Sequence, residues 1–600
     1  MALPPSPCVV AGLASFEIKA NNKLLDGIYR VLSASVTSGI NKISTASFEL
    51  IDGDPATGKF PVLDAKALKP GTPISITAGY DNVNKTLFHG VIVKIGIASQ
   101  GAQGMKLSVE CRDTAYRTST FPKNRAFKNK TTSAALTEII GKYKTSKPAI
   151  SGEFAATASV HDKLIQSSTS DWDFIVMQAE ANGQIVLNSE GKISTVVPST
   201  AKPDVLTLEY GINVYSVSLD MDARTQYTEV KVKGWDSKQK KMVTATAAPS
   251  TLVTPGDISG ATLASANGQG VYSVSTPANV DLKSLQAYAD AVLMKQTLAK
   301  IKGKVQIPGT ALAVPGCTVN LSRLGKEFSG RSFISEVRHS LGVDWKTDLT
   351  LGMDEKLFAQ AKQNVSPTTA PASTLPPVNG LYIAVVKQVQ EDPGKEFRVQ
   401  VTVPVLEETL WARLALPYAT KAAGAFFYPE VDDEVIIAFF GGDVRDPVML
   451  GALHSSTRSP AYTPDAANTK KGFVTAAKLS LEFDDKQKII TLKTPGGNQL
   501  VISDAANGLT LTDHKKNTIT MAPDGITLES KSALTIKAAK DLTLKSTEGN
   551  VIIEALTKLT ASSQQVSISG KASLELASKA TAKLEATGPL TVKGLTVLIN

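Results

Sequence analysis

Six acidic residues lie close together between Glu430 and Asp446, among strongly apolar segments of the 600-residue chain. Carboxylates at this density could bind a metal ion or act as general acids if they converged with histidines in a cleft. The nearest histidine in sequence, His454, lies beyond the next apolar run. Asp, Gly and Pro at these spacings are also what tight turns require. We therefore expect the acidic cluster to shape turns, with no catalytic, metal or cofactor site.

Other residue types that could do chemistry are few and scattered. No histidine accompanies a nucleophile elbow, a zinc-binding helix motif or a nearby cysteine, and no glycine-rich phosphate loop occurs. Asp171 and Asp173 flank Trp172 and suit the cap and first turn of a helix. The histidines and cysteines are His89, His161, His339, His454 and His514, and Cys8, Cys111 and Cys317. We therefore expect a protein that is not an enzyme.

The composition is that of a folded, β-rich protein without a membrane helix or a nucleic-acid surface. Hydrophobic residues make up 42% of the chain, and no apolar run is long enough to span a bilayer. The net charge of +9 is spread over lysines that alternate with acids, so nucleic-acid binding is not expected. The N-terminal residues lack the features of a secretory signal, which predicts synthesis in the cytoplasm without a signal peptide.

Five segments follow one another along the chain. Residues 1–362 are β-rich, with helical patterns over Thr132–Lys144, Ser170–Ala181 and Leu282–Lys300. We expect two β-barrel-like units with helices between them. The later segments are a proline-rich linker at 363–378, a compact β-module at 379–457, a connector at 458–474 and a repetitive segment at 475–600.

The repetitive segment carries an apolar–polar–apolar pair every eight residues. The first members of six pairs, Ile526, Leu534, Leu542, Val566, Leu574 and Leu590, are separated by multiples of eight. Looser pairs precede them at Leu500/Ile502, Leu509/Leu511 and Ile519/Met521. Such alternation is typical of a strand with one buried face, and the Gly, Asn, Asp and Lys residues between pairs favour corners. Each unit is therefore a short strand plus a corner.

One chain does not enclose such a core easily. Two buried side chains contribute about 3–6 kcal/mol, whereas ordering eight backbone residues costs about 8–16 kcal/mol. Cross-chain hydrogen bonds must supply the difference, and every strand edge must be paired. Three identical chains wound into a triangular prism meet both needs. A single-chain coil of about 24 residues per turn is the alternative, and amyloid-like stacking is disfavoured by the lysines.

The β-module resembles a known family. Its motifs are Trp411-Ala412-Arg413, the run Pro429 to Val435, and Gly442-Asp443 followed by Pro447-Val448. They are similar to the OB-fold of contractile-injection-system spikes: the valine-glycine-repeat protein of type VI secretion and phage tail hub-and-spike proteins. Extracellular tailocin-like and antifeeding-type particles carry the same spike. The segment around Trp172 and the eight-residue repeat resemble the family's hub and its triple-stranded β-helix.

The resemblance implies a mainly β architecture: a hub, an OB-fold, and a needle formed by a homotrimer. In the OB-fold, one position departs from the family pattern, because Asp432 stands where a glycine is usual. The residues expected to shape the OB-fold turns are Asp392, Pro429, Asp432, Asp433, Gly442, Asp443 and Pro447.

The resemblance also implies a function and partners. Three hubs would make a pseudo-sixfold ring that docks to a hexameric inner tube and to baseplate proteins. Sheath contraction would then drive the needle through the target envelope, and cargo effectors are implied as optional partners. The membrane would be met only by puncture, and the protein would leave the cell with the particle.

The C-terminal end suggests a further partner. Leu595, Val597, Ile599 and Asn600 end the chain with apolar residues and no covering segment. A blunt prism end would expose strand edges and aliphatic side chains to water. We therefore expect a small capping protein there, of the family's proline-alanine-alanine-arginine-repeat type. A frayed terminus is the alternative.

Two other functions stay open at this point. A trimeric tail fibre or adhesin that binds a surface receptor also uses β-prisms, but it would normally end in a globular head. A cell-wall hydrolase would require a pair of carboxylates in a cleft. The short connector at 458–474 leaves no room for an inserted enzyme domain of about 50–100 residues.

Overall fold

The computed structural model describes residues 12–54, 56–99, 105–236, 241–279, 281–363 and 378–599. The chain forms two compact units, Met1–Ser459 and Pro460–Asn600. Most of the predicted linker at 363–378 and the terminal Asn600 lie outside the described residues. Within the described residues, no helix combines the length and apolarity needed to cross a membrane.

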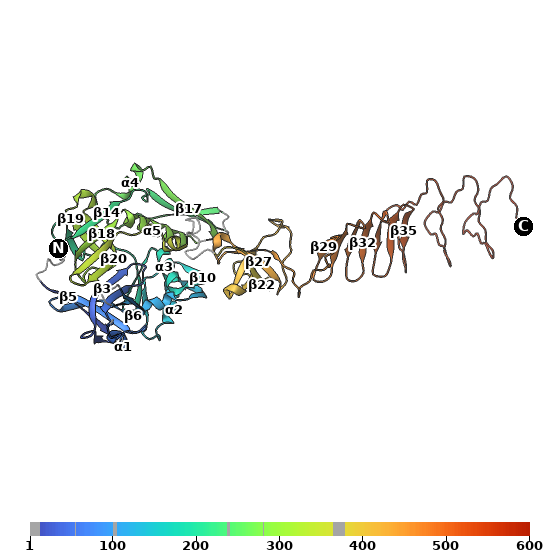
Figure 1. Ribbon diagram of the computed structural model, residues 1–600. Helices are drawn as coiled ribbons and strands as arrows, with labels where there is room; N and C mark the ends of the chain where they lie inside the picture. Colours follow the sequence, from blue (N-terminus) through green and yellow to red (C-terminus); the bar gives the residue numbers. More distant parts are fainter. Residues whose placement is uncertain are drawn as a thin grey trace. The chain divides into compact units, whose positions relative to one another are not determined.

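A 13-stranded sheet runs through the hub (Figure 1). Two separate apolar cores pack on it. The two halves join where β20 pairs with β3, with Leu341 opposite Ala34 and Glu336 opposite Gly39. Strand β4 shows why these segments are strands: Ala46, Phe48 and Leu50 alternate inward and their neighbours face out. The main path is β14 (Ser216–Met221), β18 (Ile301–Pro308), β21 (Trp345–Leu351), β20 (Gly330–Leu341), β3 (Arg30–Gly39), β4 (Thr45–Ile51), β7 (Met105–Arg112), β6 (Val83–Ser99), β5 (Pro73–Tyr80), β1 (Ala14–Ala20) and β2 (Lys23–Leu24). Off this path, β19 (Thr318–Ser322) pairs with β20, and β13 (Leu206–Glu209) pairs with β19.

Three helices occupy the places that the sequence predicts. Helix α2 (Thr132–Gly141) is capped by the Thr131 hydroxyl, which accepts from the Ala134 amide at 3.2 Å. Helix α3 (Asp171–Ala181) is capped by Ser170, and it stops before Gly183, whose φ is +67°. The third is α5 (Leu282–Ala299), and shorter helices are α1 (Pro61–Asp64), α4 (Gly260–Ala266), α6 (Gly325–Phe328) and α7 (Phe358–Gln363).

Small sheets pack with these helices. Strand β10 (Val160–Ser170) pairs with β8 (Pro122–Thr131) and leads directly into α3. Buried side chains of α5 share an apolar cluster with β15. The remaining strands of these sheets are β9 (Ser151–Phe154), β11 (Ile185–Ser189), β12 (Lys192–Val196), β15 (Glu229–Asp236), β16 (Lys241–Thr246) and β17 (Val271–Asn279).

The predicted OB-fold is a closed five-stranded barrel within the first unit. Its strands alternate buried and partly exposed residues, as in β23, where Val399, Val401 and Val403 face inward. Ile165 of the hub packs into the barrel's apolar cluster, and the Lys163 ammonium lies 3.2 Å from the Glu408 carboxylate. The barrel consists of β22 (Tyr382–Gln388), β23 (Val399–Val403), β24 (Glu408–Leu414), β28 (Pro447–Ala452) and β27 (Glu434–Phe439), with a small hairpin of β25 (Ala419–Thr420) and β26 (Ala423–Gly424).

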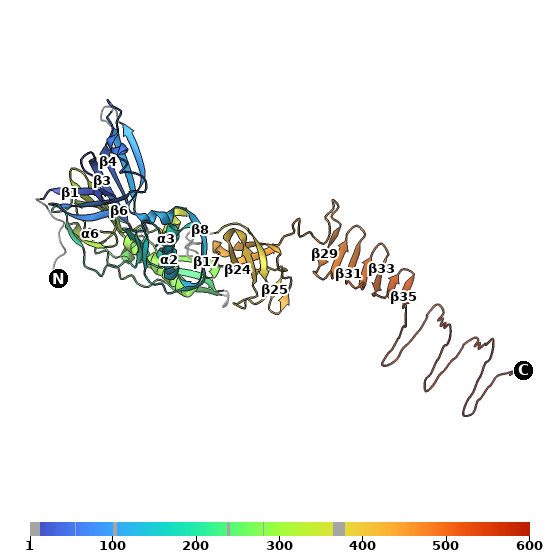
Figure 2. The same cartoon turned by 90° about the horizontal axis from the view of Figure 1, so that it is seen from below.

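The second unit has two parts that pair differently (Figure 2). Seven short strands form an antiparallel meander in chain order, each paired with the next. From Ser530 to Ile599 the described chain has no strand at all. The strands are β29 (Lys470–Val474), β30 (Ser480–Asp484), β31 (Ile489–Lys493), β32 (Gln499–Ser503), β33 (Gly508–Thr512), β34 (Thr518–Ala522) and β35 (Gly525–Glu529).

Turn chemistry explains why the two parts differ. Tight hairpins need left-handed residues, and the meander supplies them at Lys488, Gly497, Asn507 and Lys516. Beyond Gly525, no described residue has a positive φ. The predicted needle at 475–600 therefore begins as a sheet that one chain pairs by itself. The repeat that follows forms no strand pairing within its described residues.

Candidate functional site

The acidic cluster of the OB-fold is spread over separate turns. Asp443 is 2% exposed and accepts from the backbone amide of Arg445 at 2.9 Å and from its guanidinium at 2.6 Å. Gly441 and Gly442 precede it with φ of +61° and +74°, which glycine adopts without strain. Pro447 then opens β28 opposite Phe439. This corner is a turn fixed by one carboxylate.

A second turn lies just before β27. Asp433 accepts from the Glu430 amide at 2.9 Å and from the Arg458 guanidinium at 2.7 Å. Asp432, where the family usually has glycine, has a φ of +69°. A left-handed position favours glycine and tolerates Asp through its short polar side chain. Asp432 therefore adopts a conformation that a glycine also would, and Pro429 lies just before it, half-buried.

Asp392 organises the loop between β22 and β23. Its carboxylate accepts from the amides of Gly394 at 2.9 Å and Glu396 at 2.8 Å, and from the Arg398 guanidinium at 2.8 Å. Burial raises the pKa of Asp392, but these bonds to the charged form outweigh it, and the net pKa is lowered. Across the part of the chain that the structure describes, no group of three or more His, Cys, Asp or Glu could hold a metal ion.

Two buried ionic clusters in the hub escape prediction from the sequence. Asp171, expected only as a residue of a helix start, is fully buried and accepts from Lys123 at 2.7 Å, Arg125 at 3.0 Å and Tyr143 at 2.6 Å. Burial raises the pKa of Asp171, but its hydrogen bonds from Lys123, Tyr143 and Gln166 lower it overall. The only hint of this cluster in the sequence is the spacing of Lys123 and Arg125, two residues apart, which places both side chains on one face of a strand distant in sequence.

The second cluster centres on Glu180, whose carboxylate lies 2.8 Å from the Lys295 ammonium, both nearly fully buried. Glu180 also accepts from the Asn41 amide side chain at 2.7 Å and from the Phe358 backbone amide. Lys295 donates in turn to the carbonyl of Lys356. The pair thus ties α3 and α5 to the β3–β4 turn and to the start of α7, near the end of the hub.

The face of the meander sheet is an uncovered apolar surface. Register places the apolar residues of successive strands side by side in two columns, because Leu481 is opposite Leu492 and Phe483 is opposite Ile490. The first column is Phe473, Leu481, Leu492, Leu500, Leu511, Ile519 and Leu528, and the second is Phe483, Ile490, Ile502, Leu509, Met521 and Ile526. The opposite face is mostly polar, with Thr491, Thr510, Thr520 and Thr527 in one row beside Val501.

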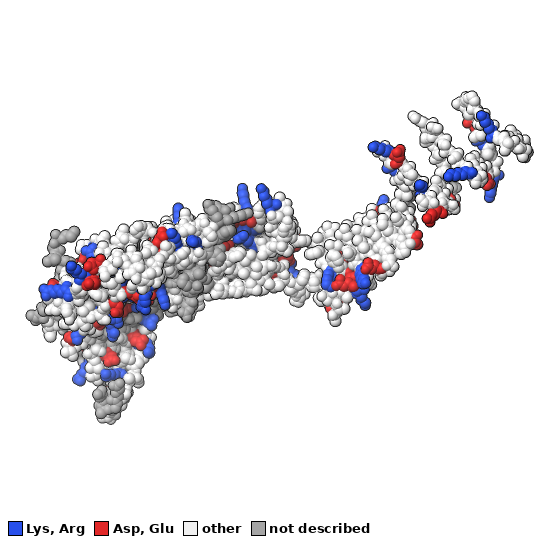
Figure 3. All heavy atoms as spheres, turned by 90° about the horizontal axis from the view of Figure 1, so that it is seen from above, with Lys and Arg blue, Asp and Glu red and all other residues white. Residues whose placement is uncertain are grey.

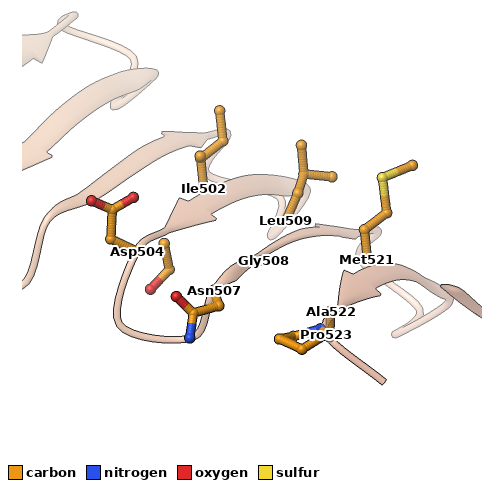
Figure 4. Close-up of a pocket in the computed structure, with 9 residues that line it drawn as sticks. Ile502, Asp504, Asn507, Gly508, Leu509, Met521, Ala522 and Pro523 are labelled. Carbon is orange, nitrogen blue, oxygen red and sulfur yellow. The ribbon is translucent and has the colours of Figure 1, made fainter. Parts of the chain in front are cut away.

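A groove crosses this sheet at one end of three strands. It has a volume of about 460 Å³ and runs from Ile502 past Leu509 to Pro523. Figure 4 shows the side chains of Ile502, Leu509 and Met521 projecting to the same side, with Asp504 and Asn507 at the turn. Nothing within the described part of the same chain fills it.

The repeat beyond the meander is exposed along its whole described length. Its apolar residues are as open as its polar ones; Leu542 and Leu574 are each 56% exposed. Leu595, Val597 and Ile599 of the predicted tip are exposed as well, and Asn600 lies outside the described residues. Positively charged lysines and negatively charged acidic residues are interspersed on the visible face of this unit (Figure 3). One chain therefore leaves both its backbone and its aliphatic side chains without cover here.

Three family models match the sequence. The Alg8 N-terminal domain matches residues 10–342, the Type VI secretion system/phage-baseplate injector OB domain matches 382–454, and the Phage baseplate V C-terminal trimerisation domain matches 489–582. No curated protein matches the sequence.

Solved structures of phage tail and type VI secretion proteins are similar to the chain. The Francisella PdpA-VgrG complex is 10% identical, with a TM-score of 0.49 over 86% of this chain and 80% of that one. The Escherichia coli type VI secretion component c3393 is 14% identical, with a TM-score of 0.45 over 73% and 99%. The tail protein from Neisseria meningitidis MC58 is 15% identical, with a TM-score of 0.42 over 57% and 98%.

Two of the family matches agree with the geometry of the parts that they cover. The OB model covers the closed barrel, and the trimerisation model covers both the meander from β31 and most of the repeat, where one chain leaves apolar side chains and backbone uncovered. The chain belongs to the family of the Alg8 N-terminal domain, and it is a VgrG-like, self-trimerising spike protein of the phage-baseplate and type VI secretion kind.

Proposed function

We propose that three copies form the central spike of a contractile injection system, dock to the hexameric inner tube, and pierce the target envelope when the sheath contracts. One observation carries this proposal: the matched trimerisation domain extends over a repeat that satisfies no strand pairing within one chain. A prism in which every strand edge is paired across copies is stiff, because bending it would break many hydrogen bonds together.

The hub and barrel support a mechanical role. The hub's two cores lie on one continuous sheet, so three copies would present six similar units to a six-membered tube. The barrel is joined to the hub by the buried Ile165 and the Lys163–Glu408 pair, which lets both move as one body. Asp392, Asp433 and Asp443 of the barrel are engaged in turns, which favours a role without catalysis.

The position of the chain in the particle tests this proposal. A gold-labelled C-terminus, imaged by electron microscopy in assembled particles, is expected on the particle axis at the baseplate end. A receptor-binding fibre or adhesin would instead place the label at the periphery of the particle. That result would contradict the spike and favour the fibre or adhesin.

We further propose that a small protein caps the tip, of the proline-alanine-alanine-arginine-repeat type. The eight-residue register after Leu590 and Val592 continues to Leu598 and the terminal position. Leu595, Val597 and Ile599 fall outside that register, so the prism interior does not need them. Apolar residues outside the interior are available to a partner.

Replacing Leu595, Val597 and Ile599 together by serine is expected to abolish capture of a co-expressed tip protein by the full chain. Leu590 occupies an apolar position of the register, so Leu590→Ser is the control. It should lower the thermal stability of the trimer but leave capture of the tip protein unchanged. Retained capture by the triple variant would indicate that the end is only frayed. Such a spike would be made in the cytoplasm and leave with the particle, with cargo effectors as additional passengers.

A further inference from the structure

The C-terminal unit contains two association surfaces of different kinds. We propose that the meander sheet, β29 to β35, is a preformed surface that recognises second and third copies of this chain, and that it fixes the register in which residues 530–599 then pair. This inference rests on the proposed trimeric spike, and it states the order in which the two parts of the C-terminal unit associate.

The meander needs partners only for its side chains. Each strand pairs with the next over four or five residues, so the backbone of the inner strands is satisfied in one chain. Its two apolar columns nevertheless remain open, with Leu492 53% and Met521 45% exposed. A continuous apolar face of this length exceeds what monomeric proteins usually expose. The face can therefore form before association and be covered by it.

The groove gives the apolar face of the meander a shape that a partner can fit. Aliphatic side chains of β32, β33 and β34 line one side, and Asp504, Asn507 and Pro523 line the strand ends (Figure 4). Its volume of about 460 Å³ can take apolar side chains of a second copy. An apolar surface with a groove favours one position of its partner over others, whereas a flat apolar surface does not.

The repeat needs partners for its backbone and specifies its own register only weakly, mainly where Asn550 and Lys558 interrupt the apolar positions. A shift by eight residues places apolar residues on apolar residues at most positions, as from Leu534 to Leu542 or from Val566 to Leu574. Register is weakly specified wherever a shifted pairing preserves the buried face. Three chains that began to pair within the repeat could therefore pair out of step.

The meander has a different period from the repeat. The first residues of the apolar pairs in β30 to β34 are Leu481, Ile490, Leu500, Leu509 and Ile519, at alternating intervals of nine and ten, and Ile526 of β35 follows after seven. A shift of eight, which keeps most apolar positions of the repeat on apolar residues, would place Phe483 on Thr491, Ile502 on Thr510 and Leu509 on Asn517. A shift of nineteen keeps the meander positions apolar but places Val566 on Glu585 and Leu574 on Lys593. Only one alignment therefore satisfies both parts, and after contact through the meander the repeat pairs outward from Glu529.

Matched pairs of substitutions in the full chain test the order. The proximal variant carries Leu500→Asp and Ile502→Asp, and the distal variant carries Leu574→Asp and Leu576→Asp, with the same chemistry and spacing. Light scattering gives the mass, and limited proteolysis with mass spectrometry maps protection. We expect the proximal variant to fall from three times 63.3 kDa to 63.3 kDa, with residues 530–599 digested. The distal variant should keep the trimer mass and lose protection only around and beyond Val566.

The outcomes separate the claims. A wild-type chain of 63.3 kDa would remove the trimer itself. A wild-type trimer that the distal variant dissociates as completely as the proximal one would overturn only the order. The milder substitutions Leu500→Thr and Ile502→Thr preserve the preference of these positions for a strand. If the trimer of this variant dissociates on dilution, misfolding of the meander is excluded as the cause of dissociation. Unchanged thermal unfolding of the hub in each variant is the folding control.

Discussion

Replacing Lys295 by methionine is expected to lower the unfolding free energy of the hub by about 3–5 kcal/mol. The substitution leaves the Glu180 carboxylate buried with only the Asn41 and Phe358 donors, and it releases the Lys356 carbonyl. An uncompensated buried charge costs far more than the pair itself contributes. Chemical denaturation, followed by fluorescence of the hub tryptophans, measures the difference.

An exposed ion pair provides the matched control. Lys192 lies 2.6 Å from Glu153 with both side chains more than half exposed, and Lys192→Met should cost less than about 1 kcal/mol. Adding Glu180→Leu to Lys295→Met removes the stranded charge and should recover much of the loss. Equal effects of the two lysine substitutions would show that Glu180 and Lys295 do not hold the segments together.

Deleting eight residues from the repeat is expected to leave a protease-resistant trimer, whereas deleting four destroys the protection that follows. Removal of Lys571–Ser578 brings Leu584 into the place of Leu576, so the inward positions stay in phase. Removal of Lys571–Leu574 moves Leu590 and Val592 by half a repeat, to positions of corners. A shift that turns an apolar set outward abolishes the buried face.

Proteolysis mapped by mass spectrometry distinguishes the two deletions. The eight-residue deletion should be as resistant as the unmodified chain, and the four-residue deletion should be digested beyond Gly570. The same digestion pattern in both would mean that the eight-residue period does not govern pairing. The mass in solution should stay at three copies in both variants, because the meander is unchanged.

Local patterns made much of this architecture predictable. Capping residues and apolar spacing placed α2, α3 and α5, and alternating residues placed the strands of the barrel. The repeat was recognisable because its period is short and its apolar residues lie on one face. The turn residues Asp392, Asp433 and Asp443 followed from the chemistry of bends, and each does organise a turn.

What the sequence did not predict depends on partners far apart in the chain. Glu180 meets Lys295 and Asn41 across 115 and 139 residues, and Asp171 meets Lys123 across 48. The pairing of β20 with β3 is equally remote. The spacing of the apolar pairs differs between the meander and the repeat, but alternation in both did not show which of them pairs with itself; the left-handed residues of the hairpins make that difference.

Hydrogen exchange at the amides of residues 530–599 in the intact chain tests the central claim most directly. That claim is that this segment acquires its interior only from other copies. Slow exchange is predicted in the species with three times the mass of 63.3 kDa, and fast exchange in any chain diluted to a monomer. Slow exchange throughout the segment in a 63.3 kDa monomer would contradict the account.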